Sequence, residues 1–136
     1  MNRYEIWLAS ELQKITNFSY GDIRILDEYP LDISQKVLKI LIEHACLGQN
    51  YGPIELARKR INEINKDWLE EHFFEVALSC VDFSDEWEYR RLVELVVLDV
   101  PKLLPKVLDK GRDSANEEVR EVVEEYSLTT YRWMKD

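Results

Sequence analysis

Apolar residues recur at spacings of three and four along most of the chain, the pattern of amphipathic α-helices. This pattern predicts a first helix over residues 3–15, a break over residues 16–21 and an irregular segment up to Asp32, which is expected to cap the next helix. Further helices are expected over residues 33–47, 53–64, 69–80, 86–97, 101–110 and 117–126. No segment alternates apolar and polar residues as a strand would, so the predicted fold class is all-α.

The chain also resembles itself at a regular spacing. Residues 41–46 align with residues 73–78, an offset of 73 − 41 = 32, and the same offset pairs Arg58 with Arg90. A third copy follows, because Arg120 lies 120 − 90 = 30 residues beyond Arg90, again between apolar positions at helical spacing. A helical repeat of roughly 30 residues predicts stacked helix pairs, an architecture that offers an elongated binding surface.

Three segments carry a proline or an aspartate at the start of a helix and an arginine inside it: residues 113–123, 52–58 and 84–90. This pattern resembles the second helix of HEAT-like repeats, and the resemblance covers about residues 33–126. It implies a short right-handed stack of about three antiparallel helix pairs, a HEAT-like α-α superhelix, with an N-terminal capping helix. It also implies structural roles for Arg58, Arg90 and Arg120, each bonded to a neighbouring turn. Only Pro101 matches the proline that HEAT-like repeats carry early in their first helix.

A length of 136 residues suits one domain that buries a core without disulfides or a metal. We expect a single helical-repeat domain over residues 1–136, with a cap and loop over 1–32, helix pairs over 33–126 and a tail over 127–136. Two structures stay open for the tail, a final half-turn packed on the last pair or a frayed end. Cys46 and Cys80 lie among apolar residues of predicted helices, which indicates reduced, buried thiols.

The chain carries 27 acidic and 18 basic residues, a formal net charge of −9. Phosphate backbones bind proteins through lysine and arginine, so we expect no nucleic-acid partner and no membrane partner. The charge favours another protein, a basic one, as the partner, and it leaves the oligomeric state open. No apolar run approaches the roughly 20 residues that span a bilayer, and the first residues lack the pattern of a secretory signal. A cytoplasmic location is therefore expected.

Residues typical of catalytic sites are scarce. The chain has two histidines and four glycines, with no glycine-rich phosphate loop and no Cys-x-x-Cys or His-Glu-x-x-His spacing. A zinc site built from His44, Cys46, His72 and Cys80 is disfavoured, because residues i and i+2 of a helix point about 200° apart. Paired carboxylates are abundant, and solvated helix faces explain them more simply than acid–base chemistry does. We therefore expect no enzyme activity, no cofactor and no metal.

Acidic residues are grouped along the chain. Between Glu63 and Glu88 the only basic residue is Lys66, and the last helix carries a nearly continuous acidic stripe from Glu117 to Glu125. Like charges at helical spacing destabilise a helix by about a few tenths of a kcal/mol each, a cost that a basic partner would offset.

Tryptophan supplies the candidate anchor for such a partner. Trp87 is either an exposed interface residue rimmed by charge or a residue packed against the neighbouring repeat, and both alternatives stay open. Trp7 and Trp68 fall nearer the apolar faces and are expected in the core. The predicted partner-binding residues are Trp87, Glu88, Arg91, Glu94, Glu117, Glu121 and Glu124.

These features favour a non-enzymatic protein–protein interaction module. In size, charge and architecture the chain resembles the immunity proteins of bacterial toxin systems, which implies a basic toxin or nuclease domain as the partner that it neutralises. Two alternatives remain: a subunit or scaffold of a larger complex, including a homo-oligomer, and a helical-repeat protein that acts on nucleic acid. Net charge disfavours the nucleic-acid alternative, because the basic clusters of this chain, Arg58-Lys59-Arg60 and Arg90-Arg91, are isolated among acidic residues.

Overall fold

The computed structural model describes the backbone of residues 2–135 and the side chains of residues 2–127. Within that range the chain is all-helical and contains no strand, as the sequence pattern predicts. The elements are α1 (Arg3–Gln13), η1 (Tyr20–Glu28), α2 (Leu31–Ala45), α3 (Tyr51–Asn62), α4 (Lys66–Cys80), α5 (Glu86–Asp99), η2 (Pro101–Leu103), α6 (Leu104–Gly111) and α7 (Glu117–Lys135), where η marks a 3-10 helix. Helix α7 continues through residues that we expected to form a tail.

Short polar residues start most of these helices. The side chains of Asn2, Asn65 and Asp85 accept hydrogen bonds from backbone N–H groups in the first turns of α1, α4 and α5. Helix α2 differs from the expectation, because its cap is Pro30 and Asp32 is the second residue of the helix, in its first turn. The restricted φ of proline holds the backbone at the point where the helix begins, and the Asp32 carboxylate suits the positive end of the helix dipole.

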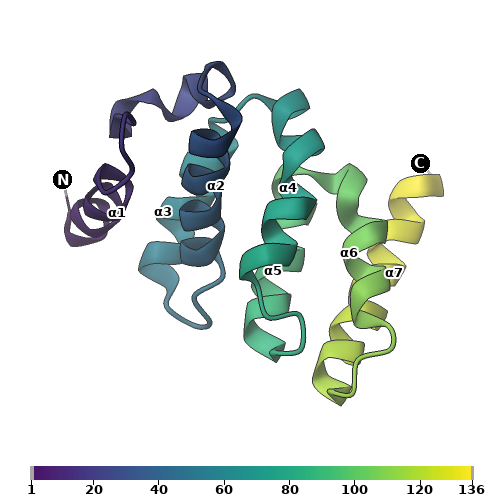
Figure 1. Ribbon diagram of the computed structural model, residues 1–136. Coiled ribbons are helices and arrows are strands. Elements are labelled where there is room, and N and C mark those ends of the chain that lie inside the picture. The colour runs from purple at the N-terminus through teal and green to yellow at the C-terminus, as the bar shows by residue number, and fades with distance from the viewer. Residues whose placement is uncertain (1, 136) are drawn as a thin grey trace.

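The helices form two layers. In Figure 1, α2, α4 and α6 lie on the side that faces the viewer, with α3, α5 and α7 behind them. Contacts follow this order, since α1 packs on α3, α3 on α5 and α5 on α7, while α2 packs on α4. Helix α1 therefore closes one end of the molecule. No helix among residues 2–135 is both long enough and apolar enough to cross a lipid bilayer.

The spacing between successive helices of one layer varies along the chain. Helix α4 begins 66 − 31 = 35 residues after α2, and α5 begins 86 − 51 = 35 residues after α3. Helix α7 begins 117 − 86 = 31 residues after α5. The alignment offset of 32 is three residues shorter than the first spacing, and the offset of 30 is one residue shorter than the last. A shift of three residues on a helix returns to nearly the same face, so the alignment still matched apolar with apolar positions.

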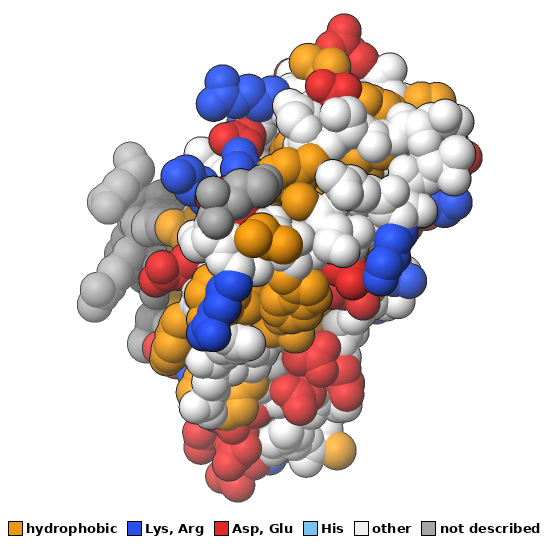
Figure 2. Space-filling model, turned by 90° about the vertical axis from the view of Figure 1, so that its left-hand side faces the viewer, with side chains coloured by type: hydrophobic (Ala, Val, Ile, Leu, Met, Phe, Trp, Pro, Cys, Tyr) orange, Lys and Arg blue, Asp and Glu red, His pale blue; other side chains and the backbone are white. Residues whose placement is uncertain are grey.

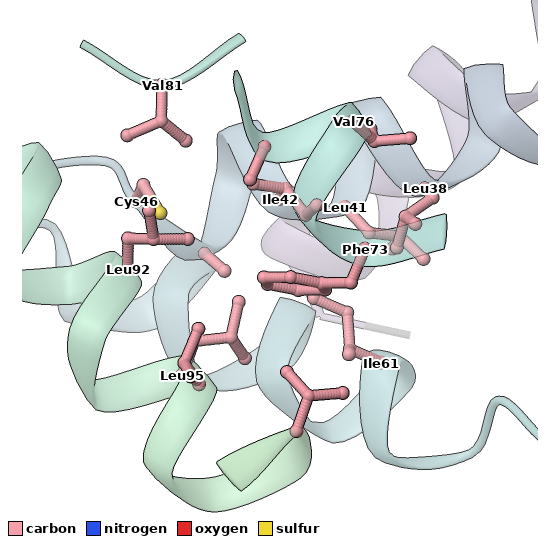
Figure 3. Close-up of a cluster of buried hydrophobic side chains, with 14 of the residues drawn as sticks. Leu38, Leu41, Ile42, Cys46, Ile61, Phe73, Val76, Val81, Leu92 and Leu95 are labelled. Carbon is pink, nitrogen blue, oxygen red and sulfur yellow. The ribbon is translucent and has the colours of Figure 1, made fainter. Parts of the chain in front are cut away.

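One continuous hydrophobic core runs from α1 to α7. Phe73 of α4 is fully buried near its middle, in the same cluster as Leu41 of α2, Ile61 of α3 and Leu95 of α5 (Figure 3). Phe73 therefore joins the two layers of helices through the core that they share. Truncating a buried phenylalanine to alanine costs about 3–5 kcal/mol. The predicted apolar stripes of these helices are confirmed as core-facing.

The prediction for Trp7 was wrong. We expected it in the core, and its side chain is 42% exposed, whereas Trp68 is half-buried and packs against the core as expected. The indole of Trp7 lies on the ring of His44, with 4.4 Å between ring centroids. Because α1 lies at one end of the molecule, it contacts the rest of the chain on one side only, and Trp7 lies at the edge of that contact.

Candidate protein-binding face

The residues predicted to bind a partner lie on or beside α5 and α7, and an ion-pair network holds two of them. Glu94 of α5 accepts hydrogen bonds from Arg58 of α3, at 2.6 Å, and from Arg91 one turn earlier, at 2.9 Å. Arg91 also donates from Nε to the backbone carbonyl of Gly48, at 2.8 Å. Burial acts to raise the pKa of Glu94, but the hydrogen bonds from Arg58 and Arg91 outweigh it, so the pKa lies below its ordinary value.

Arg91 also holds two aromatic side chains in place. Its guanidinium lies 5.0 Å from the ring centroid of Tyr51 and 5.2 Å from that of Trp87. Arg91 itself is only 6% exposed. The structure therefore gives Arg91 an internal role: it positions Trp87 and Tyr51 and presents little surface of its own to a partner.

A groove of about 450 Å³ runs between α3, α5 and α7. Its most exposed apolar side chains are Tyr51, 59% exposed, and Leu98, 62% exposed. Burial raises the pKa of Tyr126, which also lines it. We call this site the Tyr51 groove; its lining residues are Tyr51, Ile54, Glu55, Arg58, Arg91, Glu94, Val97, Leu98 and Tyr126.

A second hollow of about 510 Å³ lies where the α2–α3 loop meets the start of α5. Burial raises the pKa of Glu88. A hydrogen bond from the backbone N–H of Asp82 acts to lower it, and the negative charges of Asp85 and Asp82 act to raise it. Burial also raises the pKa of Cys80 to about 12, so this thiol stays protonated. We call this site the Trp87 pocket; its lining residues are Glu43, Cys46, Leu47, Gly48, Cys80, Asp85, Trp87 and Glu88.

The acidic stripe of α7 is solvent-exposed. Glu117, Glu121 and Glu124 are all exposed, and none of the three forms an ion pair with the described side chains. Where α7 meets α5, the neighbouring Glu118 carboxyl group raises the pKa of Glu86, and Glu121 adds to the effect while Arg90 opposes it. Carboxyl groups thus crowd together along this contact.

The three arginines that the HEAT-like resemblance assigns to structure all bond within the chain. Arg58 pairs with Glu94 of α5, and Arg90 pairs with Glu125 of α7 at 3.0 Å. Arg120 donates to the backbone carbonyl of Ser114 at 2.6 Å.

The structure divides the seven predicted residues among three places. Trp87 and Glu88 line the Trp87 pocket, Arg91 and Glu94 line the Tyr51 groove, and the three glutamates of α7 form a separate exposed face. Sequence reasoning missed Tyr51 and Leu98. Their signal was an aromatic residue two positions before Pro53 and a leucine next to the predicted apolar stripe of α5, and neither identifies a groove without the fold.

Within the described part of the chain, no three histidine, cysteine, aspartate or glutamate side chains are grouped as a metal ion would require. Comparison of the chain with protein-family models, with curated proteins and with solved structures found no match. Proposals about function therefore depend on the geometry and charge of the Trp87 pocket, the Tyr51 groove and the exposed face of α7.

Proposed function

We propose that the chain is a short HEAT-like stack of helix pairs that acts as a non-enzymatic protein-binding module. The two helix layers and the arginines bonded between neighbouring helices support the HEAT-like interpretation. The face formed by α5 and α7 binds a basic protein, with the Trp87 pocket at one end of α5 and the exposed glutamates along α7.

The observation that carries this proposal is the crowding of unpaired carboxylates between α5 and α7. The neighbouring Glu118 raises the pKa of Glu86, and Glu121 adds to this effect while Arg90 opposes it, so the carboxylates of the two helices lie close enough to repel one another. In the free protein these like charges are unfavourable. A partner that brings lysine or arginine to the face removes the repulsion and gains charge-assisted hydrogen bonds.

The class of partner that we propose is a basic toxin or nuclease domain, which the module neutralises in the cytoplasm as bacterial immunity proteins do. Size and a net charge of −9 support this proposal. Electrostatic attraction between opposite charges speeds the encounter of two proteins, so the association rate should fall steeply as salt is added.

The test compares the natural chain with a variant that carries Glu117→Gln, Glu121→Gln and Glu124→Gln. Both are immobilised and exposed to a lysate of the native host, and a basic protein retained by the natural chain is identified by mass spectrometry and purified. An exposed ion pair contributes about 0.5 kcal/mol, so we expect the loss of three such pairs to weaken binding of this protein about tenfold. Most of the loss should lie in the association rate, measured at two salt concentrations.

A matched control loses the same charge elsewhere, through Asp27→Asn, Glu28→Gln and Glu71→Gln at exposed positions of η1 and α4. Equal weakening by both variants would show that net charge alone drives binding and would remove α7 as the interface. Failure to retain any basic protein would remove the proposed function.

A second candidate function is that of a subunit in a larger assembly, because the α1 end exposes apolar surface. Figure 2 looks at this end and shows hydrophobic side chains grouped near the centre of the face. On α1, Ile6 is 57% exposed and Trp7 is partly exposed beside it. Light scattering on the purified chain separates a monomer from an oligomer, and Ile6→Ser should convert an oligomer formed through this end into monomers.

A further inference from the structure

We propose that the Trp87 pocket receives the guanidinium group of an arginine side chain presented by the partner protein. This inference rests on the proposed function and names the anchor of the interface. Three features of the pocket carry it: the sign of its charged side chains, the helix ends that meet there and its aromatic wall.

The charged groups that line the pocket are all acidic. Glu43 of α2, Asp85 before α5 and Glu88 of α5 contribute carboxylates, and no lysine or arginine is among the lining residues. Both Glu43 and Glu88 act to raise the pKa of Cys80, which places their charges close to the same wall. Lys39 acts to lower the pKa of Cys80, but its effect is weaker than that of Glu43.

Two helix C-termini add to the negative character of the pocket. Helix α2 ends at Ala45 and α4 ends at Cys80, so the negative ends of both helix dipoles lie at this site. The last turn of α4 contains no basic residue, and that of α2 contains only His44. Burial lowers the pKa of His44, which favours its neutral form. A cation is therefore favoured here, and the pocket's own side chains supply none.

The aromatic wall favours an arginine over a lysine. Trp87 lines the pocket, whereas Arg91, which lies over the same indole, does not, so Trp87 retains surface that faces the hollow. A guanidinium is planar, stacks on aromatic rings and offers five N–H donors to carboxylates and carbonyl groups, whereas an ammonium offers three donors from one point. The volume of about 510 Å³ leaves ample room for such a group.

The experiment titrates a blocked Gly-Arg-Gly peptide into the full chain labelled with ¹⁵N at tryptophan, and follows the indole N–H signals by NMR. The Trp87 signal is assigned with Trp87→Phe. We expect it to move and saturate with the arginine peptide, to move less with a lysine peptide of the same length, and to stay in place with the citrulline analogue, which has the shape of arginine without the charge.

Variants then locate the binding site. Glu43→Gln and Glu88→Gln should each weaken peptide binding about two- to fivefold, the range that one partly exposed ion pair supports. The matched variants Glu117→Gln and Glu121→Gln, which remove the same charge from α7, should leave it unchanged. A Trp87 signal that does not saturate, an equal response to citrulline or lysine, or indifference to Glu43→Gln and Glu88→Gln would overturn the proposal.

This outcome is separable from that of the proposed function. If the natural chain binds a basic protein through α7 but the arginine peptide does not affect Trp87, only the pocket assignment fails. If the peptide occupies the pocket while the α7 variant keeps full affinity for the partner, the pocket assignment stands and α7 is removed from the interface.

Discussion

Glu94→Gln should be among the most destabilising conservative changes on the binding face. The substitution keeps the size of the side chain but removes the charge that Arg58 and Arg91 share. Arg91 would then remain almost fully buried, bonded to the carbonyl of Gly48 and stacked on two aromatic rings, without a carboxylate partner. A buried cation that loses its counterion is costly.

The magnitude follows from the exposure of the three side chains. Breaking a buried ion pair by removing one partner costs about 3–5 kcal/mol, whereas a fully exposed pair contributes about 1 kcal/mol at most. The Glu94 side chain is 23% exposed, that of Arg58 is 21% exposed and that of Arg91 is 8% exposed, so the site lies between these limits. We expect the free energy of unfolding to fall by about 2 kcal/mol and the Tm by about 6 °C.

The assay is urea unfolding at pH 7 and at a series of lower pH values. The pKa of Glu94 is depressed in the folded chain, so its contribution to stability is fully present above the unfolded value, which is 4.5 for an ordinary glutamate. That contribution disappears as the pH falls through the folded pKa. The difference between the natural chain and Glu94→Gln should therefore be largest near neutral pH and shrink below about pH 4.5.

Glu55→Gln is the matched control, because Glu55 lines the same groove on α3 but is exposed. It should change the free energy of unfolding by no more than about 0.5 kcal/mol. An equal effect of the two substitutions, or a Glu94→Gln effect that stays constant as Glu94 is titrated, would refute the ion-pair reasoning.

Two further predictions concern the core and the α1 end. Gly111→Ala should destabilise the chain by about 1–3 kcal/mol in urea unfolding, because its new Cβ would lie 2.6 Å from the buried Tyr89 hydroxyl. The control Gly21→Ala, whose Cβ would meet no atom within 4 Å, should be neutral, and equal effects of the two substitutions would contradict the prediction. Burial lowers the pKa of His44, with Glu11 opposing, so protonation favours the unfolded chain and stability should be lost as pH falls below about 6.5. His44→Phe should remove that part of the pH dependence, and an unchanged pH profile would show that His44 does not cause it.

Helical periodicity was sufficient to predict the all-α class and most core positions. A stripe at spacings of three and four identifies the buried face of a helix whatever the helix packs against. Caps were predictable where a short polar side chain bonds the first turn, as at Asp85, and less so where proline restricts the backbone, as at Pro30. The alignment offset of 32 is three residues shorter than the spacing of α2 and α4, because the apolar pattern of a helix changes little when the helix is shifted by three residues, nearly one turn.

The sequence did not predict how deeply the side chains of the site are buried. Arg91 is near the buried stripe of α5 by spacing, and its long polar side chain suggested an exposed contact residue. In the fold, its surface is covered by Tyr51 from α3 and by the α2–α3 loop at Gly48, which lie 91 − 51 = 40 and 91 − 48 = 43 residues away in the chain. Trp7 is the opposite case, because the position of α1 at the end of the molecule leaves its side chain partly exposed.

The internal network and the proposed anchor are therefore linked through one side chain. Arg91 lies over Trp87, and Glu94 holds Arg91, so the position of the indole in the Trp87 pocket depends on a carboxylate one helical turn further along α5. An aromatic anchor that is held in place before binding loses less conformational entropy when a partner arrives. On this reasoning Glu94→Gln should weaken arginine-peptide binding without touching the peptide, while Glu117→Gln, which is exposed on α7, should affect neither Trp87 nor the peptide.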